Sequence, residues 1–237
     1  MLNEVLAPGS LPHGMRVYAV GDVHGCAERL AALHALIAAD ARARPAARVT
    51  LLHLGDYVDR GPDSAGVLDL LLGPPPVPGA AMVHLVGNHE VMMLDAADPR
   101  GHAGALPFWV ENGGAETLAS YGARPEDRNP WALVPEAHLG FLRRCPLRWQ
   151  AGDYLFVHAG IRPGVALDRQ DPFDLIWIRE PFLSFEGDLP LVVVHGHSPA
   201  AAPEIRPHRI GIDTGACFGG DLTCLVLEGQ RLGFLVA

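Results

Sequence analysis

Residues 15–25 read MRVYAVGDVHG, an apolar run that ends in Gly-Asp-Val-His-Gly. Four further apolar runs also end in motifs rich in Gly, Asp and His. They are VTLLHL (49–54) before 55–61, AMVHLV (81–86) before 87–90, YLFV (154–157) before 158–160, and LVVV (191–194) before 195–197. The ends of neighbouring strands in an open sheet gather at one edge, and glycines let the following loops turn sharply. The pattern therefore predicts one metal centre assembled from five loops.

Composition favours one domain and argues against several classes of partner. A chain of 237 residues with 49% hydrophobic content can bury a large core. Its net charge of −9 opposes broad binding to nucleic acid. Pro and Gly interrupt the apolar stretches before they reach membrane-spanning length, and the N-terminal MLNEVLAPGSLPHG has no apolar signal core. We expect a cytoplasmic protein, and the four cysteines, which lack CxxC spacing, to be reduced thiols.

The order of periodic segments predicts an α/β (α+β) fold. Residues 26–43 place Leu30, Leu33, Leu36 and Ile37 at helical spacing, and residues 63–73 form a second short helix. The stretch from 91 to 142 is expected to be a mainly helical insertion. From Pro146 onward the pattern is rich in strands. Two mixed β-sheets flanked by helices fit this order within a single domain, 1–237.

Six side chains at the strand ends are candidate metal ligands. Asp22 and His24 alternate along extended backbone, which directs both to the same side for one ion. The two oxygens of Asp56 can bridge two cations. The second ion would be bound by Asn88, His158 and His197. Nitrogen and oxygen ligands without thiolates suit Mn, Fe, Zn or Co better than Ca.

Two metals about 3.5 to 4 Å apart can hold a shared hydroxide and polarise phosphate for in-line attack. The leaving oxygen must then be protonated, and His89 suits this role because imidazole titrates near neutral pH. Asp59 could orient His89 and keep it protonated. Arg60 and Arg179 are candidate phosphate clamps, since guanidinium offers a planar fork of donors.

The motifs GDVHG, GDYVDRG, GNHE, HAG and GH, in this order from Gly21 to His197, resemble the phosphoprotein phosphatase group of the calcineurin-like metallophosphoesterases. The resemblance implies a four-layer sandwich, two sheets packed face to face with helices outside. It also implies the metal, acid and clamp roles assigned above. The context of Arg179 and the run 213–216, DTGA, resemble bacterial and phage protein phosphatases.

Differences between the motifs of this chain and those of related groups bear on its substrate. Eukaryotic members of the family carry HGG where this chain has His158-Ala159-Gly160, so their partner subunits are not expected here. The symmetrical diadenosine tetraphosphatases typically lack the acid at the position of Asp59 and have Asp at the position of Glu90. Both positions favour the protein phosphatase side.

These features together predict a monomeric, metal-dependent hydrolase of phosphoserine and phosphothreonine in proteins, with two divalent ions, Mn favoured. A symmetrical bis(5'-nucleosyl)-tetraphosphatase, or another small-molecule phosphoesterase, is the alternative. A non-catalytic scaffold is a third hypothesis, although the complete ligand set opposes it.

Several nearby residues have simpler interpretations. Glu90 is assigned a structural role, and Arg162 is expected to be solvated. His195 is either a contact that orients a ligand or ordinary core packing. Trp109 and Trp149 are expected to fill the core or to anchor the insertion.

Overall fold

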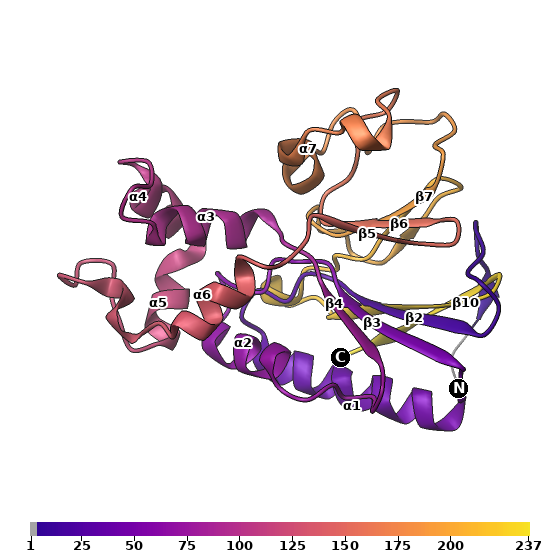
Figure 1. Cartoon of the computed structure of the whole chain (residues 1–237), viewed down its shortest axis with the longest axis horizontal. Helices are drawn as coiled ribbons and strands as arrows, with labels where there is room; N and C mark the ends of the chain where they lie inside the picture. The colour runs from indigo at the N-terminus through magenta and orange to yellow at the C-terminus, as the bar shows by residue number, and fades with distance from the viewer. Residues whose placement is uncertain (1–3) are drawn as a thin grey trace.

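Two mixed β-sheets lie face to face in the computed structural model, which describes residues 4–237 (Figure 1). One sheet has six strands in the order β1-β11-β10-β2-β3-β4, and the other has five in the order β5-β6-β7-β9-β8. The predicted fold class is confirmed. The first three residues of the predicted 1–237 domain and of the N-terminal stretch lie outside the described residues.

The strands of the six-stranded sheet are β1 (Val5–Leu6), β2 (Met15–Val20), β3 (Arg48–His53), β4 (Ala81–His84), β10 (Thr223–Glu228) and β11 (Arg231–Val236). Those of the five-stranded sheet are β5 (Arg148–Ala151), β6 (Tyr154–Val157), β7 (Val192–His195), β8 (Glu204–Ile205) and β9 (Arg209–Gly211). The short strands β1 and β8 have no counterpart in the sequence-based expectation. Both lie at a sheet edge, where two residues suffice to pair.

Helices cover the outer faces of both sheets. The α-helices are α1 (Ala27–Ala43), α2 (Ser64–Leu72), α3 (Asn88–Ala97), α4 (Ala105–Trp109), α5 (Ala115–Ser120), α6 (Glu136–Leu142) and α7 (Pro172–Trp177). A π-helical turn, η1 (Val110–Gly114), joins α4 to α5, and three short 3-10 helices are η2 (Pro130–Leu133), η3 (Leu167–Arg169) and η4 (Ala216–Phe218). Every element between β4 and β5 is helical, and the first of these helices begins at Asn88, before the 91–142 stretch of the sequence-based expectation.

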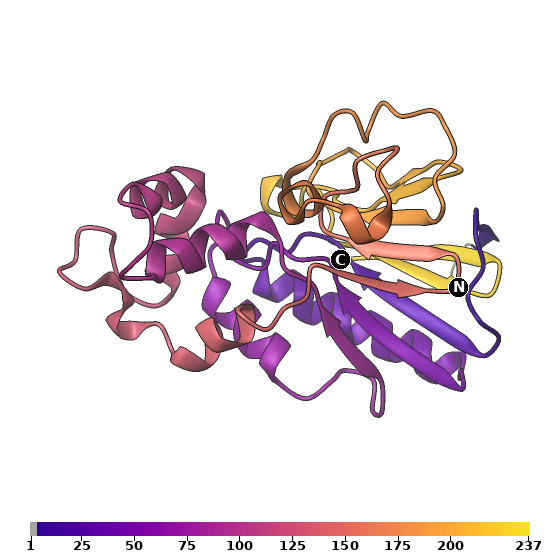
Figure 2. The same ribbon diagram turned by 45° about the horizontal axis from the view of Figure 1, so that its top comes forward.

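The elements form layers that both views make visible (Figures 1 and 2). Helices α1 and α2 cover the outer face of the six-stranded sheet, and α7 lies over the five-stranded sheet. Helices α3 to α6 extend to one side, beyond the ends of β3 and β4. Within residues 4–237, no helix combines the length and apolar character needed to cross a membrane.

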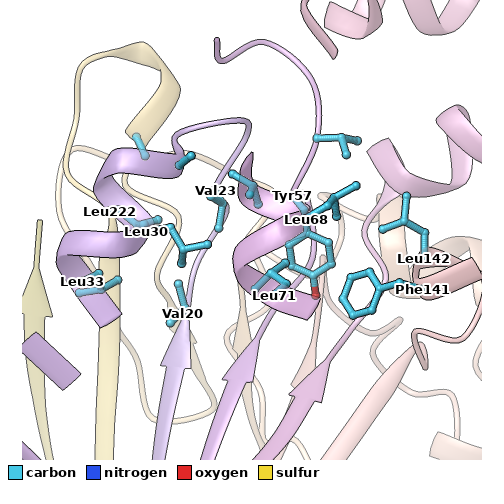
Figure 3. Close-up of a cluster of buried hydrophobic side chains, with 14 of the residues drawn as sticks. Val20, Val23, Leu30, Leu33, Tyr57, Leu68, Leu71, Phe141, Leu142 and Leu222 are labelled. Carbon is cyan, nitrogen blue, oxygen red and sulfur yellow. The ribbon is translucent and has the colours of Figure 1, made fainter. Parts of the chain in front are cut away.

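Alternate residues of the central strands enter different cores, which explains why these strands read as continuous apolar runs. In β2, Tyr18 and Val20 pack under the helices α1 and α2, whereas Val17 and Ala19 pack between the sheets. Figure 3 shows the helix-side core, with Val20 near Leu30 and Leu33 of α1. Burying each such side chain contributes roughly 1.5 to 3 kcal/mol before the entropy cost of folding.

Helix α1 follows the predicted spacing with one difference. Leu30, Leu33 and Ile37 are buried, but Leu36 is 41% exposed. His34, which the predicted spacing did not include, faces the core and contacts His53.

Parallel pairing brings the predicted motifs to one edge. Strands β2, β3 and β4 are mutually parallel, as are β6, β7 and β9 of the other sheet. The carboxyl ends of both sets lead directly into the loops that carry the candidate ligands. The site is therefore assembled at the edge where two sheets meet.

Candidate metal centre

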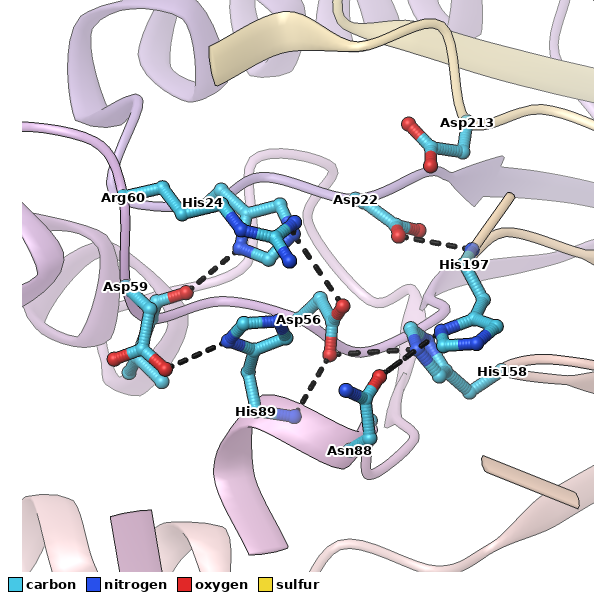
Figure 4. A network of polar contacts seen from close by, with 12 residues as sticks. Asp22, His24, Asp56, Asp59, Arg60, Asn88, His89, His158, His197 and Asp213 are labelled. Carbon is cyan, nitrogen blue, oxygen red and sulfur yellow. Dashed lines mark hydrogen bonds and ion pairs between the residues drawn. The ribbon is translucent and has the colours of Figure 1, made fainter. Parts of the chain in front are cut away.

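Two groups of ligand atoms meet at this edge, and Asp56 belongs to both (Figure 4). One group is His24, Asp56 and His89, and the other is Asp56, His158 and His197. Within each group the ligand atoms lie within 4.8 Å of one another, and all five side chains are buried. Asp56 therefore lies where a carboxylate can bridge two cations.

Backbone carbonyls orient two of the histidines. Nδ1 of His24 donates to the carbonyl oxygen of Val58 at 2.9 Å, and Nδ1 of His158 donates to that of Leu54 at 3.0 Å. Because a carbonyl only accepts, the proton of each neutral ring sits on Nδ1 and the lone pair on Nε2. Both Nε2 atoms lie near Asp56, at 3.4 Å for His24 and 3.3 Å for His158. This arrangement prepares both rings as ligands.

The side-chain oxygen of Asn88 joins the second group. Its Oδ1 lies 3.0 Å from Nε2 of His158 and 3.0 Å from Nδ1 of His197. Asn88 is the first residue of α3, so the helix start positions it beside the strand ends. The Nε2 lone pair of a neutral His158 would face the lone pairs of Asn88 and Asp56. That arrangement is favourable only with a proton or a cation between them.

Asp22, the predicted partner of His24 at one ion, is buried beside the two groups. Asp22 belongs to neither group of ligand atoms. Its Oδ2 accepts a hydrogen bond from the backbone N–H of His197 at 2.9 Å, and its Oδ1 is buried without a hydrogen-bond partner among the described residues. A side chain at Gly196 would overlap Oδ1 of Asp22, so glycine is needed there. An unpartnered buried carboxylate oxygen is costly, and a cation would satisfy it.

Burial and neighbouring charges strongly shift the pKa values of the side chains in the site. Burial, and next the Asp213 carboxylate, raise the pKa of Asp22 well above its usual value. Burial alone would raise the pKa of Asp56, but His158 and His89 hold it well below the ordinary range. Burial alone would lower the pKa of His158, yet the Asp56 carboxylate raises it to about 10. The cluster therefore attracts positive charge.

His89 and Asp59 form a buried pair beside the first group. Nδ1 of His89 donates to Oδ2 of Asp59 at 2.7 Å, which leaves Nε2 free to act on a substrate. Asp59 also accepts from the indole Nε1 of Trp109 at 2.8 Å and from Oγ1 of Thr117 at 2.8 Å. Burial raises the pKa of Asp59, and its bonds to His89, Thr117 and Trp109 oppose that rise. These donors hold the carboxylate in one orientation toward His89.

The two candidate clamp arginines lie at opposite groups. Nη1 of Arg60 donates to Nε2 of His24 at 2.8 Å, and Nη2 of Arg179 donates to the carbonyl oxygen of His197 at 3.4 Å. Both side chains belong to exposed residues. Arg162 differs, because its guanidinium forms a two-pronged ion pair with Asp174 at 2.7 Å. Arg162 thus stabilises its own loop rather than facing the ligand groups.

Glu90 holds the Asp56 loop through the backbone. Its carboxylate accepts from the N–H groups of Asp56 at 2.8 Å, Tyr57 at 2.7 Å and Gly87 at 2.8 Å. A longer bond from the N–H of Val58, at 3.3 Å, completes the set. The side chain is fully buried, and burial together with the Asp56 charge raises its pKa to about 7. Glu90 therefore holds the loop that carries Asp56.

Backbone strain is concentrated in the same loops. Within residues 4–237, the non-glycine residues with positive φ are His24, Asp56, Asp59, Arg60 and His197, with φ between 43° and 74°. Such conformations cost of order 1 to 3 kcal/mol each and persist where surrounding structure enforces them. Their confinement to the predicted site residues supports a functional role for these loops.

The donor set suits divalent metal ions. Imidazole nitrogens, carboxylates and an amide oxygen converge without any thiolate, a donor set that suits Mn, Fe, Zn or Co. The unpartnered Oδ1 of Asp22 and the opposed lone pairs around His158 are both explained by cations. The residues present therefore fit a pair of metal ions.

Some contributors were not in the predicted site. Trp109 and Thr117, from the helical insertion, hold Asp59, and buried Asp213 follows β9 beside Asp22 (Figure 4). The signal for Asp213 was the strand end before Asp-Thr-Gly, which parallels the other motifs. His195 packs edge-on against Phe182, and its Nδ1 donates to the carbonyl oxygen of Gly196. Trp149 packs on Phe156 as core.

Comparisons with known proteins identify the family. The sequence profile of the calcineurin-like phosphoesterases matches residues 15–228. The chain is 31% identical over 221 residues to a serine/threonine-protein phosphatase 1 of Salmonella typhimurium, covering 87% of this chain and 89% of that protein. It is 32% identical over 154 residues to a symmetrical bis(5'-nucleosyl)-tetraphosphatase of Methylococcus capsulatus, covering 63% of this chain but only 44% of that protein.

A solved structure shares the architecture. The cold-active protein-tyrosine phosphatase of the psychrophile Shewanella sp. superposes with a TM-score of 0.58 at 18% identity, covering 96% of this chain and 83% of that one. At this identity the similarity concerns the fold alone. With the matched profile and the paired ligand groups, it follows that this chain belongs to the calcineurin-like phosphoesterase family.

Proposed function

We propose that this chain is a metal-dependent protein phosphatase that hydrolyses phosphoserine and phosphothreonine monoesters. The observation that carries the proposal is the buried pair of His89 and Asp59, 2.7 Å apart, beside two ligand groups that share Asp56. A general acid at this position serves an ester whose leaving oxygen must be protonated.

Each residue has a defined task in this reaction. Arg60 and Arg179, at opposite ligand groups, bind the phosphate oxygens and orient the ester. The residues that would hold the metal ions are Asp22, His24, Asp56, Asn88, His158 and His197, and the bound ions would supply Lewis acidity and an activated water. Nε2 of His89 donates a proton to the leaving serine or threonine oxygen. Asp59 stabilises the protonated imidazole through Nδ1.

The choice of a protein substrate rests first on sequence identity among relatives that align along their whole length. A serine/threonine-protein phosphatase is 31% identical, whereas symmetrical tetraphosphatases that align over 92% of this chain are 26 to 27% identical. The relative named as a serine/threonine phosphatase aligns over 87% of this chain and 89% of its own length. Asp59 is also held by three donors and is central to the proposed acid. We propose Mn as the working metal, one of the ions that mixed nitrogen and oxygen donors suit.

Hydrolysis of diadenosine tetraphosphate is the second candidate. A relative named as a symmetrical tetraphosphatase is 32% identical over 154 residues, and the same ligand groups could act on a phosphoanhydride. An anhydride has a more acidic leaving group than a serine, so it depends less on a general acid. The well-built His89–Asp59 pair therefore favours the monoester.

A substrate panel tests the proposal. The protein is stripped with a chelator and assayed with Mn²⁺ on a phosphoserine peptide and on diadenosine tetraphosphate. We expect a higher kcat/KM on the phosphopeptide and loss of turnover without metal. Preference for the dinucleotide would assign the chain to the nucleotide hydrolases, and no turnover of either would support the scaffold hypothesis.

A further inference from the structure

An exposed aromatic side chain lies beside the candidate phosphate clamp. Phe218 is 66% exposed, and the guanidinium carbon of Arg60 lies 5.5 Å from the centre of its ring. Arg60 in turn contacts His24 of the first ligand group. A substrate phosphate bound by Arg60 would therefore place the rest of the substrate near Phe218.

The loop that carries Phe218 is built to hold it there. Gly215 and Gly219, on either side of the short helix η4, adopt left-handed conformations with φ of 70° and 89°. The N–H of Gly215 donates to Asp213 Oδ1 at 3.0 Å, and the N–H of Phe218 donates to the carbonyl oxygen of Gly215 at 2.8 Å. The guanidinium of Arg60 lies over this ring, and most of the Phe218 side chain remains exposed to a substrate bound beside Arg60.

Phe218 lines a groove of about 350 Å³ together with residues of the helical insertion. We call it the Phe218 groove, and its lining is Arg60, Glu111, Asn112, Gly113, Glu116 and Phe218. Arg60 links the groove to the site, because its guanidinium also contacts His24 of the first ligand group. Its walls come from two distant parts of the chain, the η1–α5 segment and the loop after β9.

The charge of the Phe218 groove selects among substrates. Glu111 and Glu116 are exposed, and across residues 4–237 neither forms an ion pair within 4.0 Å. Two free carboxylates repel a polyphosphate chain and attract a lysine or arginine side chain. The aromatic face of Phe218 adds a favourable surface for the same cation.

We infer that the Phe218 groove binds a basic side chain next to the phosphorylated residue of a peptide substrate. The inference rests on the proposed protein phosphatase function and adds a sequence preference to it. Phe218 contacts the apolar stem or the cationic group of that side chain, and Glu111 and Glu116 supply the opposite charge. Phosphate binding offsets the charge of Arg60, which would otherwise repel the incoming cation.

Four substrates and three variants test this inference. The substrates are p-nitrophenyl phosphate, a phosphoserine peptide flanked by arginines, the same peptide flanked by glutamates, and diadenosine tetraphosphate. The wild type should prefer the arginine peptide over the glutamate peptide by roughly five- to tenfold in kcat/KM. Phe218→Ala should lower the ratio of arginine-peptide to p-nitrophenyl phosphate kcat/KM by roughly five- to tenfold, mainly through KM.

The double variant Glu111→Gln and Glu116→Gln should remove the preference for the arginine peptide. The matched control is Phe108→Ala, since Phe108 is 51% exposed on α4 and is not part of the groove lining. This control should keep the wild-type ratios.

Distinct results would overturn the inference. Equal losses on the peptide and on p-nitrophenyl phosphate would mean that Phe218 only supports Arg60. A loss confined to diadenosine tetraphosphate would mean that the ring stacks on a base. Wild-type turnover of both peptides at equal rates would remove the charge preference while leaving the proposed function intact. Turnover of neither peptide would reject the proposed function itself.

Discussion

His89 and Asp59 lie 2.7 Å apart, and Asp59 is fully buried beneath the insertion that supplies Trp109 and Thr117. The Asp59 carboxylate therefore connects the candidate metal centre, through His89, to the helical insertion, through Trp109 and Thr117. Nδ1 of His89 is occupied by this contact, so only Nε2 remains available for chemistry. The same ring also belongs to a group of possible ligands with His24 and Asp56. Two roles for His89, acid or ligand, follow from this position.

Substitution of His89 separates these two roles. We expect His89→Asn to lower kcat by roughly 10² to 10⁴-fold, the scale of a lost general acid. Metal content per chain, measured by mass spectrometry of the elements, should equal that of the wild type. Loss of a metal ion in this variant would instead make His89 a ligand. Asp59→Asn is the companion variant and should also reduce kcat with the metal content retained.

Asp56 should control both metal ions, because it belongs to both ligand groups. We expect Asp56→Asn to weaken binding at both positions, since the shared negative charge is removed while the shape is kept. Metal titration by calorimetry and activity at saturating substrate test this expectation. Full activity restored by substrate alone would show that Asp56 does not bridge. Asp174→Asn, whose carboxylate pairs with Arg162, is the control and should leave the metal titration unchanged.

Removal of the Glu90 carboxylate should destabilise the fold and the Asp56 loop together. Glu90→Ala leaves four backbone N–H groups without their acceptor, including those of Asp56 and Tyr57. Each unsatisfied buried donor costs about 1 to 3 kcal/mol, although water entering the space left offsets part of this. We expect a loss of unfolding free energy of roughly 3 to 5 kcal/mol, measured by urea denaturation.

Glu90→Gln is the matched comparison, because its amide oxygen can still accept some of these bonds. It should lose less stability than the alanine variant. An alanine variant as stable as the wild type would show that other groups hold the loop.

A cluster of three histidines, two of them buried and His84 half-buried, should make stability depend on pH. His53 stacks on His84 with ring centres 5.0 Å apart, and Nε2 of His34 lies 3.0 Å from Nε2 of His53. Burial lowers the pKa of His34 and of His84 to about 4 each, and that of His53 well below its usual value. The folded state thus keeps these rings neutral, whereas the unfolded chain protonates them near pH 6.5.

The free energy of unfolding is therefore unaffected by these histidines above pH 6.5. It falls as the pH drops from 6.5 toward 4, because the unfolded chain then binds protons that the folded state does not. Each ring contributes a slope of about 1.4 kcal/mol per pH unit in that window. Glu90 acts in the opposite sense, because its pKa is raised to about 7. Comparison with His84→Phe isolates the cluster, since phenylalanine keeps the stack on His53 without titrating. We expect a smaller fall in urea midpoint between pH 7 and 5 for this variant, and equal falls would contradict the assignment.

The sequence predicted the ligand loops because the chemistry lies at the ends of regular strands. Strands β2, β3 and β4 are parallel, so the loops after Val20, His53 and His84 had to reach one edge. The alternation of Asp22 and His24 predicted that both bind one ion, which stays a prediction, although the extended backbone that it assumed ends at His24. His24 has a φ of 43°, and Oδ2 of Asp22 accepts from the backbone N–H of His197, while its Oδ1 has no hydrogen-bond partner among the described residues. Local turns of this kind break the simple alternation of a strand.

The sequence did not predict the contacts that the helical insertion makes with Asp59. Trp109 lies 50 residues from Asp59, and Thr117 lies 58 residues away. Their approach depends on how α4 and α5 pack beside α2 and α3, which no periodic pattern encodes. The amphipathic character of the insertion predicted helices without predicting which buried face would meet the acid pair. The position of Phe218 was likewise not predicted, because its exposure and its contact with Arg60 arise only in the folded chain.

Diffraction from crystals grown with Mn²⁺, recorded at the manganese absorption edge, is the most direct measurement of the site. We expect two anomalous peaks about 3.5 to 4 Å apart, with Asp56 between them. One peak should lie near Asp22 and His24, and the other near Asn88, His158 and His197. A single peak, or two peaks that do not share Asp56, would contradict a paired centre bridged by that carboxylate.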